Sequence, residues 1–197
     1  MKARYISIIA ALATFLFTYQ ARAQFEIGDN VAGISVGIGG HYRAYTSYSS
    51  QSPALGLYCE KGVTDLGAGV LGVGGFIGYK TLTYNSRASW VLGPGFEYDW
   101  RWTYLIIGVR GAWHYNEWHG LAELDTYGGL MLSYNSVSWK DDTRYPEGFV
   151  STYSASSGGI GLTGFIGARY YFTPQFGAQL ELGYGISVLS LGIVYKF

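Results

Sequence analysis

The 197-residue sequence is poor in charged residues, cysteine and proline. Charged residues make up 13% of the chain, about half of the ~25% that is usual in soluble domains. The formal net charge is zero, so the composition gives no indication of a nucleic-acid partner. The single cysteine, Cys59, excludes an intrachain disulfide, and no Cys/His spacing typical of a metal site is present. We therefore expect no cofactor and no metal.

Long apolar runs are also missing beyond residue 23. No segment there has the ~18 consecutive apolar residues that indicate a membrane helix. The chain is nevertheless 49% hydrophobic, and it contains 19 tyrosines and 30 glycines. The aromatic content argues against disorder, and the glycines argue against a helical bundle. A β-barrel reconciles high hydrophobicity with short apolar runs, because its lipid-facing residues occupy alternate positions.

The first 23 residues have the three parts of a signal peptide. Lys2 and Arg4 form a basic start, residues 6–19 are mostly apolar, and Ala21-Arg22-Ala23 is an A-x-A cleavage site. The apolar part is shorter than the ~20 residues that a spanning helix needs, which disfavours the alternative of a retained anchor. We expect export through a cleavable signal peptide, residues 1–23, and one mature domain, residues 24–197.

The remaining chain consists of segments in which apolar and small or polar residues alternate, as in β-strands. Three long polar segments, 42–53, 81–100 and 140–157, alternate with short turns at 62–65, 116–121 and 173–175. An even-stranded barrel with both termini in the periplasm predicts this rhythm, with the long segments as extracellular loops. A switch of phase at Val70-Leu71 predicts a bulge. The eight expected strands are 30–41, 54–61, 66–80, 101–115, 122–139, 158–172, 176–184 and 188–197.

In these segments, the residues of the phase with small side chains favour a membrane barrel over a soluble barrel or sandwich. A soluble barrel turns its polar phase to water and would carry Lys, Glu and Thr there. Here that phase is mainly Gly, Ala, Ser and Thr, which suits the crowded interior of an eight-stranded barrel. Aromatic residues gather at the expected strand ends and predict two interfacial girdles. The outer girdle would contain Tyr42, Trp100, Trp102 and Trp139; the periplasmic girdle would contain Trp113, Tyr115, Tyr170, Phe172, Phe176, Tyr195 and Phe197.

The last segment is the most specific pattern in the sequence. Apolar residues occupy every second position and the chain stops at an aromatic residue: Leu189, Leu191, Ile193, Tyr195 and Phe197. This pattern resembles the β-signal read by the outer-membrane assembly machinery. The resemblance implies recognition by that machinery, with periplasmic chaperones as earlier partners.

Three further stretches, 73–79 (VGGFIGY), 165–174 (FIGARYYFTP) and 181–185 (ELGYG), add to a family resemblance. With them, residues 25–197 resemble the small outer-membrane β-barrel domain family, the OmpA/OmpX-type "porin family" class. The resemblance implies an all-β fold, an eight-stranded antiparallel up-and-down transmembrane β-barrel in the outer membrane of a Gram-negative cell. Outer-membrane lipid would surround it. No peptidoglycan-binding domain follows the barrel in this sequence.

Charged residues on the inward phase fall in the periplasmic half of their strands: Glu60, Arg110, Asp125, Arg169, Glu181 and Lys196. Buried charges are tolerated when they pair. Adjacent strands suggest the pairs Arg110–Asp125 and Arg169–Glu181. We interpret the six residues as an interior polar network that plugs the barrel; a narrow pore for small solutes is the alternative.

A lipid A-modifying enzyme is a second alternative. It would require a histidine beside a serine at the outer rim, where His41 lies near Ser47, Ser49 and Ser50. His114 and His119 lie toward the periplasm, the wrong end for that chemistry. We therefore expect no enzyme activity. The expected role is structural or interactional, with a possible surface ligand held by the segments 42–53, 81–100 and 140–157, which are rich in Tyr, Ser and Trp.

Overall fold

The computed structural model describes residues 24–40, 50–87, 97–144 and 150–197. The expected signal peptide lies outside these residues. The described part is built from strands: β1 (Asn30–Ile38), β2 (Ser50–Gln51), β3 (Ala54–Asp65), β4 (Val70–Arg87), β5 (Glu97–His114), β6 (Leu124–Arg144), β7 (Val150–Tyr171), β8 (Phe176–Gly183) and β9 (Leu189–Lys196). Within the same residues, no helix has the length and hydropathy needed to cross a membrane.

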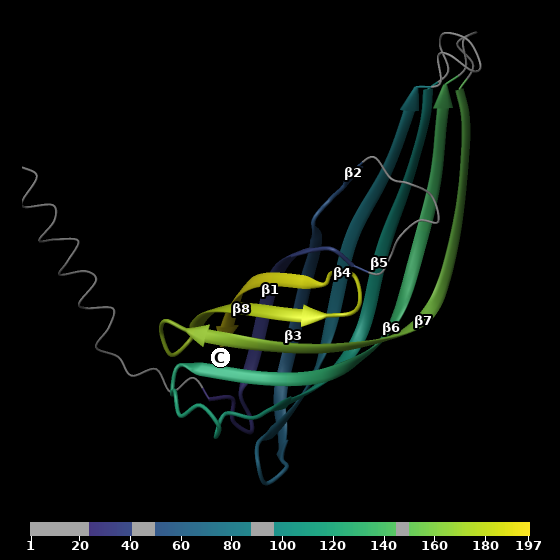
Figure 1. The fold of residues 1–197 in the computed structure, drawn as a ribbon. Coiled ribbons are helices and arrows are strands. Elements are labelled where there is room, and N and C mark those ends of the chain that lie inside the picture. Colours follow the sequence, from purple (N-terminus) through teal and green to yellow (C-terminus); the bar gives the residue numbers. More distant parts are fainter. Residues whose placement is uncertain (1–23, 41–49, 88–96, 145–149) are drawn as a thin grey trace, which may run out of the picture.

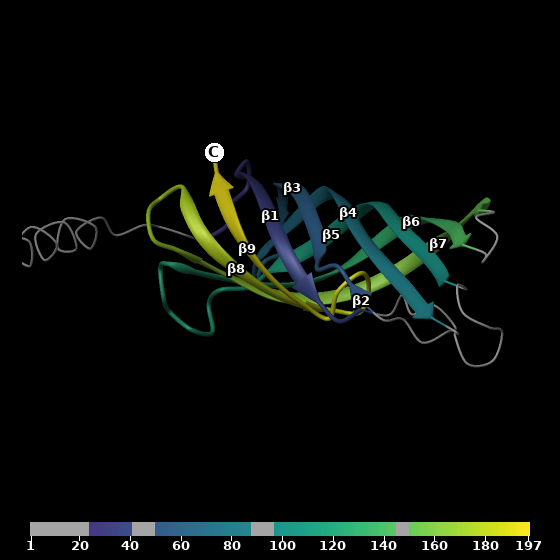
Figure 2. The ribbon, with the colours of Figure 1, turned by 90° about the horizontal axis from the view of Figure 1, so that it is seen from above.

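Eight of these strands close into a barrel, which confirms the expected all-β, antiparallel up-and-down fold (Figure 2). Each strand pairs with the next one along the barrel, and β1 closes the ring against β9 from Val31↔Lys196 to Ile38↔Leu189. The two-residue β2 stands outside the ring and pairs only with β4, at Leu82 and Thr83. Closure leaves no free edge around the short half of the barrel.

Side chains alternate between the two faces of the wall. The inward phase carries the buried residues, among them Tyr58, Met131 and Phe165. The outward phase carries large apolar residues that are exposed to the surroundings of the barrel. We call this outer surface the apolar belt; it includes Ile34, Val36, Leu55, Leu57, Val73, Ile77, Leu105, Ile107, Val109, Leu130, Leu132, Ile160, Leu162, Ile166, Leu180, Leu182, Leu191 and Ile193.

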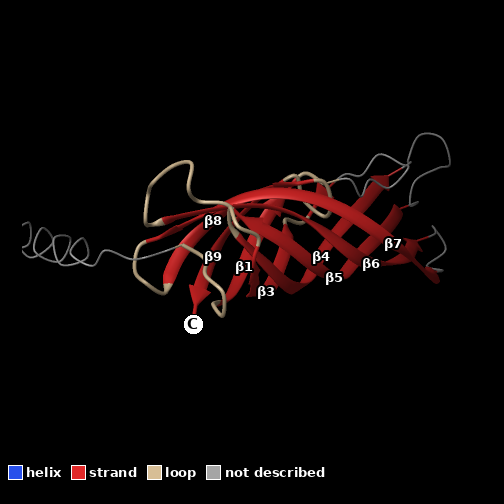
Figure 3. Cartoon of the chain, turned by 90° about the horizontal axis from the view of Figure 1, so that it is seen from below, coloured by secondary structure: helices blue, strands red, loops and turns tan. Residues whose placement is uncertain are grey.

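Four strands are much longer than the others. In Figures 1 and 3, β4, β5, β6 and β7 continue beyond the end of the closed barrel, whereas β1, β3, β8 and β9 stop at its rim. β3 pairs with β4 only as far as Tyr79, and β8 pairs with β7 only from Phe165 onward. We call the extension the protruding sheet, residues 80–87, 97–104, 136–144 and 150–159. Its outward phase is polar: Thr81, Thr83, Arg101, Ser138, Lys140, Ser154 and Ser156.

Several expected boundaries are therefore wrong. The segments 81–100 and 140–157 are not loops, because 81–87, 97–100, 140–144 and 150–157 are strand. Beyond the apolar belt both phases contain polar residues, so the alternation that marks a membrane strand disappears from the sequence while the backbone ladder continues. Of the segment 42–53, residues 42–49 lie outside the described residues, and Ser50–Gln51 forms β2.

The first periplasmic turn is also displaced. β3 runs to Asp65 with a register shift between Gly62 and Thr64, and the turn is 66–69, where the Leu66 N–H donates to the Gly69 carbonyl over 2.8 Å. The expected bulge at Val70-Leu71 and the expected turn at 62–65 are therefore wrong. Gly67 and Gly69 have φ of 85° and 144°, which explains the two glycines in this turn.

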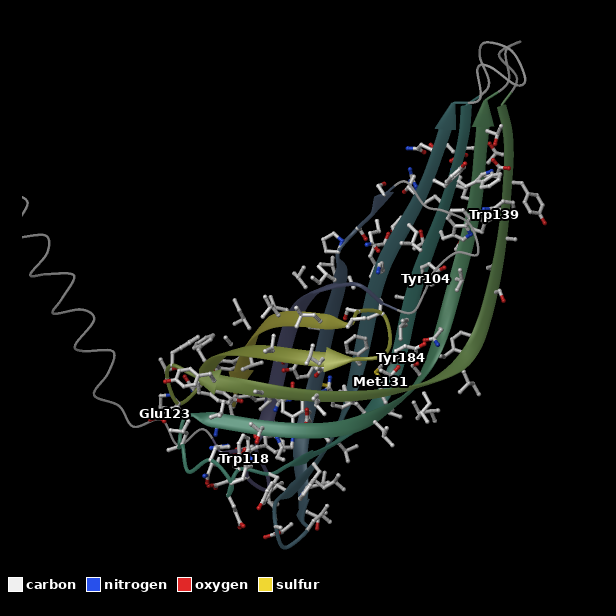
Figure 4. All side chains as sticks on the ribbon, viewed as in Figure 1. Tyr104, Trp118, Glu123, Met131, Trp139 and Tyr184 are labelled. Carbon is white, nitrogen blue, oxygen red and sulfur yellow. The ribbon has the colours of Figure 1, made fainter. Side chains whose placement is uncertain are left out.

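The positions of the aromatic residues differ from the two girdles that the sequence predicts. The periplasmic end has a row of exposed rings in contact: Phe176 lies 4.8 Å from Tyr195, and Tyr195 lies 5.9 Å from Phe197. At the other end, Trp100, Trp102 and Trp139 are on the inward phase of β5 and β6, so they do not form an outer girdle. Figure 4 shows Trp139 on the protruding sheet and Met131 nearer the closed part. Tyr42 lies outside the described residues.

Candidate functional site

The candidate site is a cluster of charged side chains inside the half of the barrel that contains Asn30 and Phe197, the expected periplasmic half. The side chains come from the inward phases of β3, β5, β6, β7 and β8, and each is buried or almost buried. We call the cluster the interior network: Glu60 from β3, Arg110 and His114 from β5, Asp125 from β6, Arg169 from β7 and Glu181 from β8.

The layer nearest the expected periplasmic end is centred on Arg169. Its Nη2 lies 2.7 Å from Oε2 of Glu60, and its Nη1 lies 3.4 Å from Oδ2 of Asp125. His114 joins the same two carboxylates, with Nε2 2.5 Å from Glu60 Oε1 and Nδ1 2.9 Å from Asp125 Oδ1. All four side chains have 0% exposure, so each carboxylate must be satisfied from within the protein.

Both ring nitrogens of His114 face carboxylate oxygens. When both carboxylates are ionised they only accept hydrogen bonds, and both ring nitrogens then donate, as in the imidazolium form. The interior network then holds three cations, Arg110, His114 and Arg169, and three anions, Glu60, Asp125 and Glu181. Exact compensation of charge is what allows such a cluster to stay buried, because an uncompensated ion in the interior costs several kcal/mol.

The second layer, further from the periplasm, is centred on Glu181. Arg110 Nη2 lies 2.8 Å from its Oε2, and the same oxygen accepts from the Tyr127 hydroxyl over 3.1 Å. Gln179 donates to Glu181 over 3.3 Å and accepts a hydrogen bond from the Tyr58 hydroxyl. Phe165 lies under the Arg110 guanidinium, 4.0 Å from Cζ to the ring centroid. Aromatic rings thus fill the space around the cations and favour them electrostatically.

Residues next to the expected cleavage site close the mouth at the expected periplasmic end, which we call the periplasmic mouth. The Phe25 ring is 3% exposed and stacks on His114 with centroids 4.0 Å apart. Lys196 lies at this mouth and not in the interior network: its Nζ is 3.3 Å from Oδ2 of Asp29 and 3.4 Å from the Gln24 carbonyl. The final strand therefore binds the segment that precedes β1.

The expected pairs of charges are wrong, although the structure places the residues on the inward phase. Arg110 pairs with Glu181 and not with Asp125, and Arg169 binds Glu60 and Asp125 and not Glu181. In the β5–β6 register Arg110 lies opposite Met131, six residues from Asp125. Glu60 reaches Arg169 across the lumen, a contact between strands that are not neighbours and that no adjacent-strand reasoning could find.

Sequence reasoning also missed five members of the site: Tyr58, His114, Tyr127, Gln179 and Phe25. One signal was available, because His114 shares the phase of Arg110 four residues earlier on the same strand. The position of Phe25 carried no such signal, since it precedes the first strand.

Two cavities approach the interior network from opposite sides. On the outer side, a cavity of about 40 Å³ reaches Arg110 and Glu181 and is also lined by polar residues such as Ser35 and Ser187 and by apolar residues such as Phe76 and Met131. At the periplasmic mouth, a cavity of about 200 Å³ reaches His114 beside Phe25 and Glu117. The interior network and Phe25 separate the two. The outer cavity has room for one or two water molecules.

The described residues contain no group of three His, Cys, Asp or Glu side chains placed to hold a metal ion. The carboxylates of the interior network are occupied by Arg110, Arg169 and His114, which leaves little free basicity for acid–base chemistry. Of the residues considered for lipid A chemistry, His41, Ser47 and Ser49 lie outside the described residues, and Ser50 is in β2.

Comparison with known proteins finds no matching family model and no matching curated protein. Among solved structures, the chain is similar to Ail, the attachment invasion locus protein of Yersinia pestis, in complex with the heparin analogue sucrose octasulfate. Identity is 15%, coverage is 87% of this chain and 99% of Ail, and the TM-score is 0.47. It is also similar to the N-terminal β-barrel domain of Pseudomonas aeruginosa OprF, with 14% identity, coverage of 88% and 100%, and a TM-score of 0.48.

Proposed function

We propose that this chain is an outer-membrane β-barrel protein whose lumen is closed by the interior network and whose protruding sheet presents a contact surface outside the cell. The apolar belt is the observation that carries the proposal. Ile160 is 82% exposed and Leu162 is 68% exposed, and the other residues of the apolar belt are 41–63% exposed. A continuous apolar surface of this size does not occur on a soluble monomer, but it matches a lipid-facing wall.

The height of the apolar belt also supports a membrane environment. It extends from Trp113 to Leu105 on β5 and from Phe172 to Ile160 on β7. At ~3.3 Å per residue and a tilt of about 40°, these spans correspond to a layer of roughly 20 to 30 Å, close to the ~25 Å apolar band of outer-membrane barrels. The protruding sheet, with its polar outward phase, would then lie in water.

The compensated charges of the interior network support the proposal that the lumen is closed. A solute pore needs a continuous wet path, whereas here Arg169, His114 and their carboxylates are fully buried across the lumen and Phe25 covers them. Opening the path would require separating ion pairs that lie at hydrogen-bond distance. A narrow pore through the same residues is the alternative function.

Conductance distinguishes the two. The purified protein, inserted into planar lipid bilayers, should show no stable openings, while a general porin inserted under the same conditions provides the positive control. Stable ohmic steps from the purified protein would overturn the closed-lumen part of the proposal.

Membrane insertion is tested separately. Folded protein should float with phospholipid vesicles and migrate differently on gels before and after boiling. Recovery of the folded protein free of lipid in the soluble fraction would contradict the proposal. We propose a role without catalysis; lipid A from cells that express the protein should keep an unchanged mass spectrum, and a new lipid A species would contradict that part.

A further inference from the structure

Aromatic side chains gather on one face of the protruding sheet. This face carries the inward phase, which continues the wall of the lumen, whereas the outward phase of the same strands is polar. Because the rings are on the inward phase, contact with membrane lipid does not explain them. They come from all four strands, and we call them the aromatic face: Tyr84 from β4, Trp100 and Trp102 from β5, Trp139 from β6 and Tyr153 from β7.

The strand register arranges these rings in two adjacent rows across the sheet. Tyr84 lies opposite Trp100, and Trp102 lies opposite Trp139 in the next row. Tyr84 stacks on Trp100 with ring centroids 5.4 Å apart, and the Trp139 ring lies 5.5 Å from that of Tyr153. Tyr153 is 58% exposed, and the other four side chains are half-buried. The rings therefore form a surface that is held by rigid strands and is open to a ligand.

A carboxylate lies among the rings. In the register, Asp141 is between Trp100 and Tyr153. Its Oδ1 accepts from the Thr143 N–H over 3.0 Å and from the Thr143 hydroxyl. Among the described residues, Oδ2 of Asp141 has no hydrogen-bond partner. An ionised carboxylate at this position can accept hydrogen bonds from the hydroxyl groups of a ligand and repels an anionic one.

The size of the aromatic face decides between two kinds of ligand. Neighbouring strands are ~4.8 Å apart and residues two apart on a strand are ~6.6 Å apart, so four strands and three positions cover roughly 14 by 13 Å, or about 200 Å². A stable protein interface buries about 800 Å² on each partner, which is about four times this area. A short run of sugar rings fits it. The C–H groups on the apolar side of a sugar ring also suit the electron-rich faces of Tyr and Trp.

We infer that the aromatic face is a binding site for an uncharged glycan, whose sugar rings stack on the Trp and Tyr side chains and whose hydroxyl groups donate to Asp141. The lipids of the same membrane surround the outward phase, so the ligand of this inward face is a glycan that is not anchored in that membrane. The inference deepens the proposed function and rests on it, because the protruding sheet must lie outside the cell.

The test uses the full protein in phospholipid nanodiscs on a printed array of neutral oligosaccharides, their sulfated counterparts and unglycosylated peptides. Neutral oligosaccharides should bind above the level of empty nanodiscs, and more strongly than the sulfated ones. Trp139→Ala should weaken this binding about tenfold, because a stacking ring is lost. Trp118→Ala is the matched control: Trp118 is 66% exposed in the turn between β5 and β6, at the opposite end of the barrel, and its loss should leave binding unchanged.

A second pair of variants lies on a single strand. Tyr153→Ala should also weaken binding, whereas Tyr170→Ala, on the outward phase at the other end of β7, should not. Asp141→Asn keeps an acceptor and removes the charge, so the preference for neutral over sulfated glycans should fall about fivefold. Gel migration before and after boiling reports whether each variant folds.

Four results would overturn the inference: no neutral glycan binds, sulfated glycans bind as strongly as neutral ones, peptides bind more strongly than glycans, or folded Trp139→Ala binds like the wild type. Vesicle flotation and conductance on the same preparations test the proposed function. Failure of glycan binding is therefore distinguishable from failure of the membrane assignment.

Discussion

Replacing Arg169 by methionine should strongly destabilise the barrel. The guanidinium is completely buried and lies 2.7 Å from Glu60 and 3.4 Å from Asp125. Its removal leaves two buried carboxylates with one cation, His114, between them. Breaking a buried ion pair by removing one partner costs about 3–5 kcal/mol, while methionine preserves much of the packing volume. We expect a loss of this size in the free energy of unfolding.

Arg101→Met is the matched control, because Arg101 undergoes the same chemical change on the exposed outer phase of β5. Its effect should stay within about 0.5 kcal/mol. Unfolding in guanidinium from phospholipid vesicles, followed by tryptophan fluorescence, measures both variants. Adding Glu60→Gln to Arg169→Met should restore part of the loss, because one uncompensated charge disappears. A change below about 1 kcal/mol for Arg169→Met, or one equal to that of Arg101→Met, would refute the account of the interior network.

Three further predictions concern the mouth, the wall and the final strand. Phe25→Ala should destabilise the closure of the periplasmic mouth and produce brief conductance events in bilayers. If the variant shows no more conductance events than the wild type, Phe25 does not contribute to the closure. Gly74→Ala should reduce the folded fraction severely, because a Cβ there meets the Cys59 carbonyl oxygen at 1.9 Å, whereas Gly75→Ala should be tolerated with its nearest atom at 3.9 Å; gel migration compares them. Phe197→Ala should slow assembly into outer-membrane vesicles with unchanged final stability, and an unchanged rate would argue against a β-signal.

The strand count and the direction of side chains were predictable from sequence. Alternation has a period of two in any strand, so residues such as Leu105, Ile107 and Val109 reveal their shared face without knowledge of any neighbour. The same reasoning assigned Arg110 and Arg169 to the inward phase. Where the belt ends, this signal also ends. The sequence therefore predicts loops at 81–100 and 140–157, although the backbone there continues the ladder of β4 to β7 at 81–87, 97–100, 140–144 and 150–157.

Which residues form ion pairs across the lumen could be known only from the tertiary structure. Glu60 and Arg169 are far apart in sequence and belong to strands that do not pair, so only closure and stagger of the barrel bring them to 2.7 Å. The same closure places Phe25 on His114. Within the apolar belt the sequence by itself determines which way the side chains point; the register of eight strands around a ring decides which side chains meet, because that register is a property of the whole sheet.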